Sequence, residues 1–232
     1  MTSPRFRLLP LALGAVLLAS CGMAQERRTY ELRVFSPAPS AGPNAEGWTV
    51  TLDRAEVNIG PVRFYEGRVE HARFSPLEWI IGAAWAHPGH FHPGEAMGEW
   101  LDVRTVDLLG GNASLGTVNG VTGAYGSIVL TLPAGEAGHS VLLSGVASRA
   151  GAADVPFELT VTLEEDLPPL RFETEIDSAP GYVELEIDLG GWLRGVDFTD
   201  AATPGGQAHN ALTRAVRDAG NYQARWIRAG TR

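Results

Sequence analysis

The stretch Tyr182-Val183-Glu184-Leu185-Glu186-Ile187-Asp188-Leu189 carries the clearest structural signal in this chain. Large aliphatic residues occupy every second position in it, and acidic residues lie between them. Side chains of a β-strand point alternately to its two faces, so this period of two predicts a strand with one buried and one solvated face. The residues expected to face the core are Val183, Leu185, Ile187 and Leu189.

The same alternation recurs along most of the chain, and Pro- and Gly-rich turns separate the runs. The further predicted strands are Tyr30–Val34, Trp48–Leu52, Val57–Ile59, Val62–Phe64, Ser127–Leu132, Ser140–Ala147, Phe157–Leu163, Arg171–Glu175 and Tyr222–Ile227. The pattern slips by one residue after Leu52, which predicts a β-bulge near Arg54–Ala55. Many short strands with alternating patterning predict an all-β fold, an antiparallel two-sheet β-sandwich.

Helical spacing is confined to two short segments. Apolar residues at every third or fourth position predict a C-terminal helix over Gln207–Ala219, which Gly220 ends. A second short helix is expected over Pro76–Ala86. No internal repeat or low-complexity linker interrupts the rest, so residues 30–232 are expected to form a single β-sandwich domain.

The amino-acid composition excludes several classes of protein. The 232 residues are 44% hydrophobic, which is enough for a substantial core and too much for a disordered chain. All 18 basic residues are arginines, and the net charge is −9. An acidic chain lacks the basic face that displaces counterions from phosphates, so we expect no nucleic-acid partner.

The N-terminus has the pattern of a signal peptide over residues 1–20. Arg5 and Arg7 precede a twelve-residue apolar run, Leu8–Ala19, which is shorter than the roughly 20 residues that a transmembrane helix needs. Secretion to an extracytoplasmic compartment is therefore expected.

The end of that leader, Leu18-Ala19-Ser20-Cys21, resembles the lipobox of bacterial lipoproteins. The resemblance implies that Cys21 becomes the acylated first residue of the mature protein, with residues 21–29 as a lipidated tether to the membrane. Gly22 after the cysteine implies sorting to the outer membrane, facing the periplasm. The alternative is an ordinary secretory signal with a coincidental cysteine. Cys21 is the only cysteine, so no disulfide can form within the chain.

Three of the six histidines lie within six residues: His87, His90 and His92. Neutral imidazoles are common ligands of transition metals, and two or three of them with a carboxylate suffice for zinc or copper. Glu95 and Met97 follow closely and could supply an oxygen or a thioether ligand. A copper or zinc ion is therefore the expected cofactor. The alternatives are a surface loop whose imidazoles bond to backbone carbonyls, and a loop that only senses pH.

The remaining histidines and the tryptophans carry weaker signals. His71 is a further candidate ligand, whereas His139, before a strand, and His209, within the helix, are expected to be structural. Three tryptophans flank the histidine segment, namely Trp79, Trp85 and Trp100, and three others lie in strand contexts, namely Trp48, Trp192 and Trp226. Core packing is the expected role of tryptophan, with stacking on a sugar as the alternative.

Three parts of the C-terminal sequence together resemble the closing module of periplasmic copper-binding proteins of the MbnP-like type. They are the stretch from Glu186 to Phe198, the helix after it and Tyr222-Gln223-Ala224-Arg225-Trp226. Val62-Arg63-Phe64-Tyr65 is similar to an early strand motif of the same family. The resemblance implies a β-sandwich that binds copper through histidine and is paired with a dihaem oxidase.

These observations favour a lipid-anchored periplasmic metal-binding protein that acts in metal acquisition, buffering or delivery. Its partners would be the membrane, through the anchor, and a metal transporter or a periplasmic oxidase. The alternative is a binding or assembly lipoprotein that presents a Trp-rich loop to a protein or glycan. The sequence contains no Gly-x-Ser-x-Gly elbow, phosphate loop or His-Glu-x-x-His motif, so an enzyme is not expected, and a zinc-dependent hydrolase is the remaining enzymatic alternative.

Overall fold

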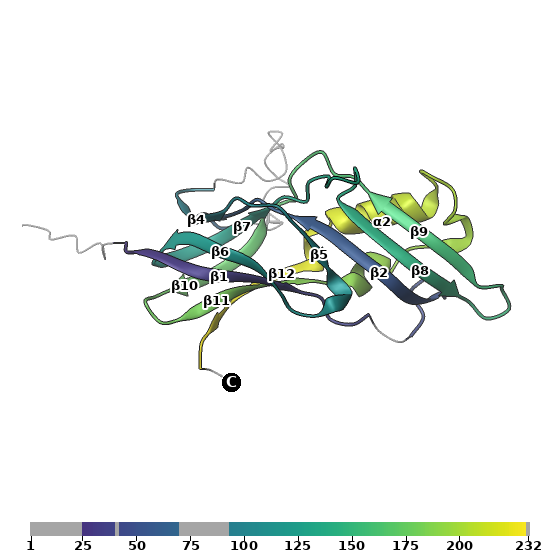
Figure 1. Cartoon of the computed structure of the whole chain (residues 1–232), viewed down its shortest axis with the longest axis horizontal. Coiled ribbons are helices and arrows are strands. Elements are labelled where there is room, and N and C mark those ends of the chain that lie inside the picture. The colour runs from purple at the N-terminus through teal and green to yellow at the C-terminus, as the bar shows by residue number, and fades with distance from the viewer. Residues whose placement is uncertain (1–24, 40–41, 70–92, 231–232) are drawn as a thin grey trace, which may run out of the picture.

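The computed structural model describes residues 25–39, 42–69 and 93–230 (Figure 1). These residues form the strands β1 (Arg27–Phe35), β2 (Thr49–Ile59), β3 (Val62–Tyr65), β4 (Ala96–Trp100), β5 (Arg104–Asp107), β6 (Ala113–Val121), β7 (Gly123–Leu130), β8 (Val141–Ser148), β9 (Val155–Val161), β10 (Leu170–Ile176), β11 (Gly181–Ile187) and β12 (Tyr222–Arg228). They also form the helices α1 (Leu189–Leu193) and α2 (Gln207–Arg217) and the 3₁₀ turns η2 (Leu108–Gly110), η3 (Phe198–Asp200) and η4 (Ala219–Asn221).

The strands build two sheets, so the predicted all-β sandwich is confirmed. The larger sheet has the order β10-β7-β3-β4-β6-β1-β11-β12, and the smaller has the order β5-β2-β8-β9. The antiparallel prediction needs one correction, because β1 and β11 run parallel to each other. These two strands are far apart in sequence, so no hairpin sets their relative direction.

Most predicted elements lie where the alternation placed them. The slip after Leu52 is a true register shift of β2 against β8, between Leu52 and Arg54. Helix α2 covers the predicted range up to Arg217. The first strand begins at Arg27, within the predicted tether, because Arg27 and Arg28 pair with the end of β6 despite their charge.

Three strands and one helix were not predicted, namely β4, β5, β6 and α1. Strand β6 contains two glycines, Gly116 and Gly120, which weaken the β signal of its sequence. Strand β5 is only four residues long. These elements form through pairing with their neighbours rather than through their own composition.

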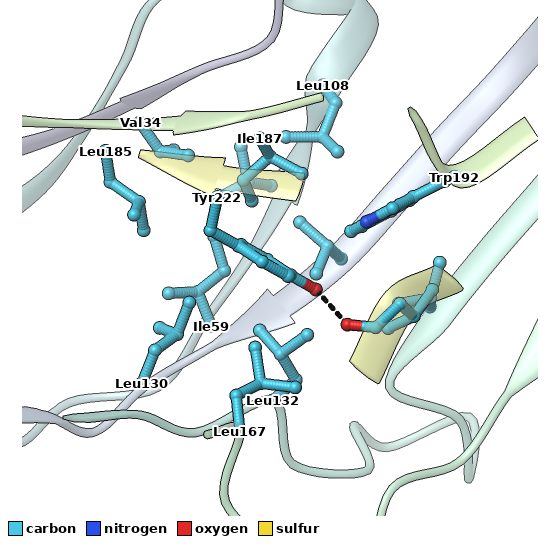
Figure 2. Close-up of a cluster of buried hydrophobic side chains, with 14 of the residues drawn as sticks. Val34, Ile59, Leu108, Leu130, Leu132, Leu167, Leu185, Ile187, Trp192 and Tyr222 are labelled. Atoms are coloured by element: carbon cyan, nitrogen blue, oxygen red, sulfur yellow. Dashed lines mark hydrogen bonds between the residues drawn. The ribbon is translucent and has the colours of Figure 1, made fainter. Parts of the chain in front are cut away.

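The two sheets share a core in the middle of the molecule. Val34, Leu185 and Ile187 of the larger sheet lie close to Ile59 of the smaller one, and all four are almost fully buried (Figure 2). Tyr222 lies in the same cluster and donates a hydrogen bond from its hydroxyl to the Val216 carbonyl at 2.5 Å. This core binds the sheets and the C-terminal helix into one unit.

The sheets are offset along the long axis of the molecule. The smaller sheet and α2 lie toward one end, whereas β4, β6, β7 and β10 lie toward the other (Figure 1). Beyond the reach of the smaller sheet, the larger sheet curls so that its two edge strands, β10 and β12, come into contact. The sheet therefore covers its own inner face at that end, which we call the curled end.

Aromatic side chains fill the inside of the curled end. Tyr30 lies edge-on to Trp226 at 5.5 Å between ring centroids and to Phe64 at 5.9 Å. Phe172 lies 5.7 Å from Phe64 and 6.0 Å from Tyr125. Edge-to-face contacts of this kind add to the stabilisation from burial, so the interior is packed rather than hollow.

Candidate functional site

The histidine segment lies largely outside the described residues. His71, His87, His90 and His92 are not among them, and neither are Cys21 and the helix expected over 76–86. Glu95 and Met97 are described. The structure therefore describes only the residues that flank the predicted metal site.

The two flanks of the histidine segment are joined to each other. The Glu66 amide donates to the Glu95 carbonyl at 3.0 Å, and the Gly67 amide donates to the Pro93 carbonyl at 2.8 Å. The flanking strands β3 and β4 are themselves paired. The chain thus leaves and re-enters the larger sheet at one point.

That base is packed tightly on β7. The Ser127 hydroxyl donates to the Gly67 carbonyl at 2.6 Å, and a Cβ atom at Gly126 would lie 2.3 Å from the Glu66 carbonyl oxygen. Only glycine fits such an approach of two backbones, which explains the residue at position 126. The base of the segment is therefore held by backbone contacts that do not depend on the histidines.

The two described candidate ligands differ in their surroundings. Glu95 is exposed at the base of the segment, whereas Met97 is 2% exposed and belongs to the hydrophobic core. The Met97 sulfur lies 3.8 Å from the side-chain amide nitrogen of Gln25, two residues before β1. Glu95 therefore faces solvent, whereas Met97 is part of the core. Gln25, far away in sequence, could not be predicted as a neighbour of Met97.

Beneath Met97 lies a buried pair of tyrosines. The Tyr125 hydroxyl donates to the Met97 carbonyl at 2.8 Å and lies 3.4 Å from the Tyr30 hydroxyl. Burial raises the pKa of Tyr30 well above its usual range, with its neighbour Tyr125 as a smaller cause, and burial also raises the pKa of Tyr125. Both hydroxyls therefore stay protonated at physiological pH and act as hydrogen-bonding groups rather than as bases.

A hollow of about 640 Å³ lies beside this base, over the neighbouring strands β4, β6 and β1. Strands β4 and β6 pair only through Gly98–Gly120 and Glu99–Asn119. The hollow is lined by three short runs of residues, namely Arg27–Thr29, Ala96–Glu99 and Asn119–Val121. Its lining includes the carboxylate of Glu99, the amide of Asn119 and the two arginines Arg27 and Arg28. The sequence could not predict this hollow, because it depends on the pairing of three strands that are far apart in the chain.

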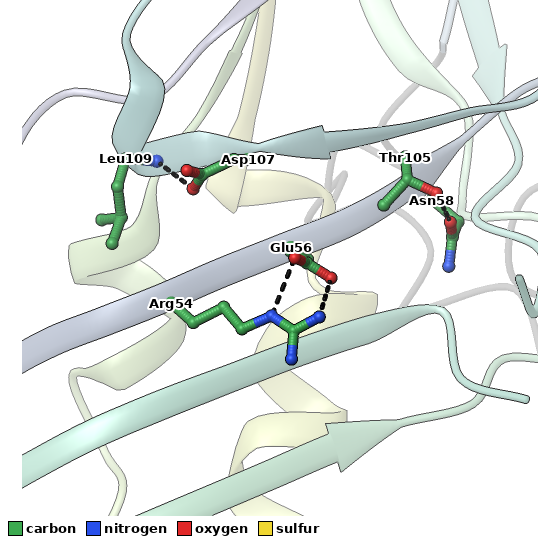
Figure 3. A network of polar contacts seen from close by, with 6 residues as sticks. All are labelled: Arg54, Glu56, Asn58, Thr105, Asp107 and Leu109. Carbon is green, nitrogen blue, oxygen red and sulfur yellow. Dashed lines mark hydrogen bonds and ion pairs between the residues drawn. The ribbon is translucent and has the colours of Figure 1, made fainter. Parts of the chain in front are cut away.

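Two histidines, His139 and His209, lie within the described residues. His139 precedes β8, and its carbonyl accepts from the Asn58 side-chain amide at 2.7 Å. The Asn58 carbonyl oxygen in turn accepts from the Thr105 hydroxyl at 2.6 Å, which joins β2 to β5 (Figure 3). His209 lies in α2, half-buried beside a hollow of about 440 Å³.

The described tryptophans mainly pack the core. Trp48, Trp100 and Trp192 are at most 3% exposed, and Trp226 is half-buried against the curled end. The Trp48 indole donates to Asp197 at 3.0 Å, and the Arg149 guanidinium stacks on its ring at 4.3 Å. The rings of Trp48, Trp100 and Trp192 are therefore too deeply buried to stack on a sugar. Trp79 and Trp85 lie outside the described residues.

Within the described ranges, no group of three or more His, Cys, Asp or Glu side chains could hold a metal ion. No helix in the same ranges is long and apolar enough to cross a bilayer. No protein-family model matches the chain, and no curated protein or solved structure matches it significantly.

Proposed function

We propose that this chain is a lipid-anchored periplasmic protein that binds copper or zinc through the segment containing His87, His90 and His92. The single observation that carries the proposal is the presence of three imidazoles within six residues. Side chains at positions 90 and 92 of an extended backbone project to the same side, which suits two ligands of one ion. Its role would be metal acquisition, buffering or delivery.

The position of the segment supports this proposal. Its base is clamped by the bonds from Glu66 to Glu95 and from Gly67 to Pro93, at 3.0 and 2.8 Å. A clamped base lowers the entropy lost when a loop closes around an ion. The described residues alone do not fit a metal, so the nitrogen donors would come from the segment, with His71, Glu95 or Met97 completing the set.

Copper is the better candidate of the two metals in this proposal. Divalent copper outcompetes zinc at most nitrogen and oxygen sites, and the resemblance to MbnP-like proteins points in the same direction. Anchoring through Cys21 would keep the protein at the outer membrane, where a transporter or a periplasmic oxidase could exchange metal with it.

The test is metal uptake by the purified mature protein, measured by elemental analysis and calorimetric titration with Cu²⁺ and Zn²⁺. We expect one ion to bind per chain and its affinity to fall below about pH 6 as the imidazoles protonate. The double variant His90→Ala/His92→Ala should lose most of this affinity. The matched control is His139→Ala/His209→Ala, which removes two histidines that lie outside the segment.

Equal uptake by both double variants and the wild type would assign the metal to another site. No uptake by the wild type would leave the segment as a surface loop without a metal-binding role. Either outcome contradicts the proposal. Loss in the first double variant alone supports it.

A further inference from the structure

Arg28 and Trp226 meet inside the curled end of the larger sheet. Arg28 lies near the start of β1, and its guanidinium carbon is 5.9 Å from the centre of the Trp226 ring in β12. One terminal nitrogen of Arg28 donates to the Ala179 carbonyl, in the turn before β11. That bond uses Nη2, whereas Nε has no acceptor among the described residues.

Two donors at this position are buried without an acceptor. They are Nε of Arg28 and Nε1 of Trp226, and nothing in the part of the chain that the structure describes accepts a hydrogen bond from either. Nearly all buried N–H groups in proteins are paired, and a charged donor without an acceptor is especially costly. Two such donors on neighbouring residues therefore indicate an acceptor supplied from outside these strands.

The acidic residue of the adjoining turn does not fill this role. The two carboxylate oxygens of Asp177 are used elsewhere: one accepts from the Ala179 amide at 2.9 Å and the other from Arg228 at 2.8 Å. Asp177 therefore balances Arg228 rather than Arg28. Among the described residues, no carboxylate forms an ion pair with Arg28.

Each of the two residues lines a hollow at the surface. Arg28 lines the hollow of about 640 Å³ over β4, β6 and β1, and Trp226 lines a second hollow of about 460 Å³ beside Thr174 and Glu175. The donor atoms Nε and Nε1 are themselves buried, so a ligand would reach them only if a side chain moved.

We infer that Arg28 and Trp226 form a binding site for the carboxylate group of a small ligand. A planar carboxylate can accept from the Nε edge of an arginine with one oxygen and from an indole N–H with the other. The aromatic packing behind the pair leaves no room for a large group, so the rest of the ligand lies in the hollows. This site is independent of the proposed metal-binding segment.

The test uses the ¹⁵N-labelled mature protein, titrated with sodium acetate at constant ionic strength maintained with chloride. The arginine Nε–H and tryptophan Nε1–H signals are followed, and those of Arg28 and Trp226 are assigned by the variants Arg28→Lys and Trp226→Phe. Both signals should shift with a common saturation curve. Each variant should weaken acetate binding about tenfold or more. Lysine keeps the positive charge but lacks the planar guanidinium, and phenylalanine keeps an aromatic ring but lacks the indole N–H donor.

The matched control is Arg225→Lys, a surface arginine of β12 that bonds to Glu184 and Glu186 at 2.9 and 3.0 Å. It should leave acetate affinity unchanged. The inference is overturned if neither wild-type signal moves below about 100 mM acetate, or if Arg28→Lys and Arg225→Lys behave alike. If Arg28→Lys does not fold, the wild-type titration and Trp226→Phe still decide the matter.

Discussion

At the scale of single residues, two glycines explain how the tyrosine pair beneath Met97 is accommodated. Gly98 and Gly120 face each other across β4 and β6. A Cβ atom at Gly98 would lie 3.0 Å from the Tyr30 hydroxyl, and one at Gly120 would lie 2.9 Å from the Tyr125 hydroxyl. The missing side chains thus make room for two buried hydroxyl groups.

Gly120→Ala should destabilise the protein by about 1–3 kcal/mol, because the added methyl group overlaps two packed tyrosines. Chemical denaturation monitored by circular dichroism measures this loss. Gly195→Ala is the control, since a Cβ atom there meets nothing within 4 Å and the residue is exposed. Equal stability of the two variants would show that the tyrosine packing is looser than described.

Asp197 should make stability depend on acidic pH. Its Oδ1 accepts from the Thr199 hydroxyl at 2.7 Å, the Thr199 amide at 3.0 Å and the Trp48 indole at 3.0 Å. These bonds lower the pKa of Asp197, and the bond from the Thr199 hydroxyl is the largest cause. A lowered folded-state pKa means that the stabilisation is complete above the unfolded pKa of about 3.9 and is lost as the pH falls through the folded value.

Asp197→Asn should therefore cost stability at neutral pH, and its difference from the wild type should shrink below about pH 4. The measurement is the free energy of unfolding from pH 7 down to pH 3 for both proteins. Asp53→Asn, at an exposed position in the bulged part of β2, serves as the control. A difference that stays constant over this range would contradict the role given to the Asp197 carboxylate.

At the scale of elements, the C-terminal helix depends on a residue outside it. The N-terminal neighbour of α2, Gly206, has no side chain to cap the helix. Asp200, in the 3₁₀ turn η3, supplies the cap instead, because its carboxylate accepts from the Gln207 amide at 2.6 Å and the Ala208 amide at 3.0 Å. The apolar face of α2, with Ala208, Leu212 and Val216 buried, is thereby held over β9.

Asp200→Ala should cost about 0.5–2 kcal/mol, the usual range for the loss of a helix N-cap. Thermal unfolding measures it, with far-ultraviolet circular dichroism to follow helix content. Asp200→Asn keeps one acceptor oxygen and should lose less. If Asp200→Asn and Asp200→Ala were equally destabilised, the charge rather than the hydrogen bonds would be responsible.

At the scale of the whole molecule, the N-terminal chain and the base of the histidine segment lie together at the curled end. Gln25 precedes β1 and contacts Met97, two residues after Glu95. This contact holds residue 25 against the strand that follows the histidine segment.

The proposed lipid anchor predicts a specific mature protein. Mass spectrometry of membrane-extracted material should find Cys21 as the first residue, with acyl chains attached, because two or more chains are needed for stable anchoring. Cys21→Ala should accumulate as an unlipidated precursor. Met1 as the first residue of the membrane-bound protein would rule out the lipoprotein assignment.

Local pattern in the sequence was enough to predict the strands with one apolar face, the bulge after Leu52 and helix α2. Each of these depends on the spacing of neighbouring residues, which sequence shows directly. The parallel pairing of β1 with β11, the glycine-bearing strand β6 and the contact between β10 and β12 depend on partners far away in the chain. Histidines at short spacing could likewise be recognised as candidate ligands. The approach of Arg28 to Trp226 could not, because it depends on β1 and β12 both pairing with β11, and these pairings join strands that are far apart in the chain.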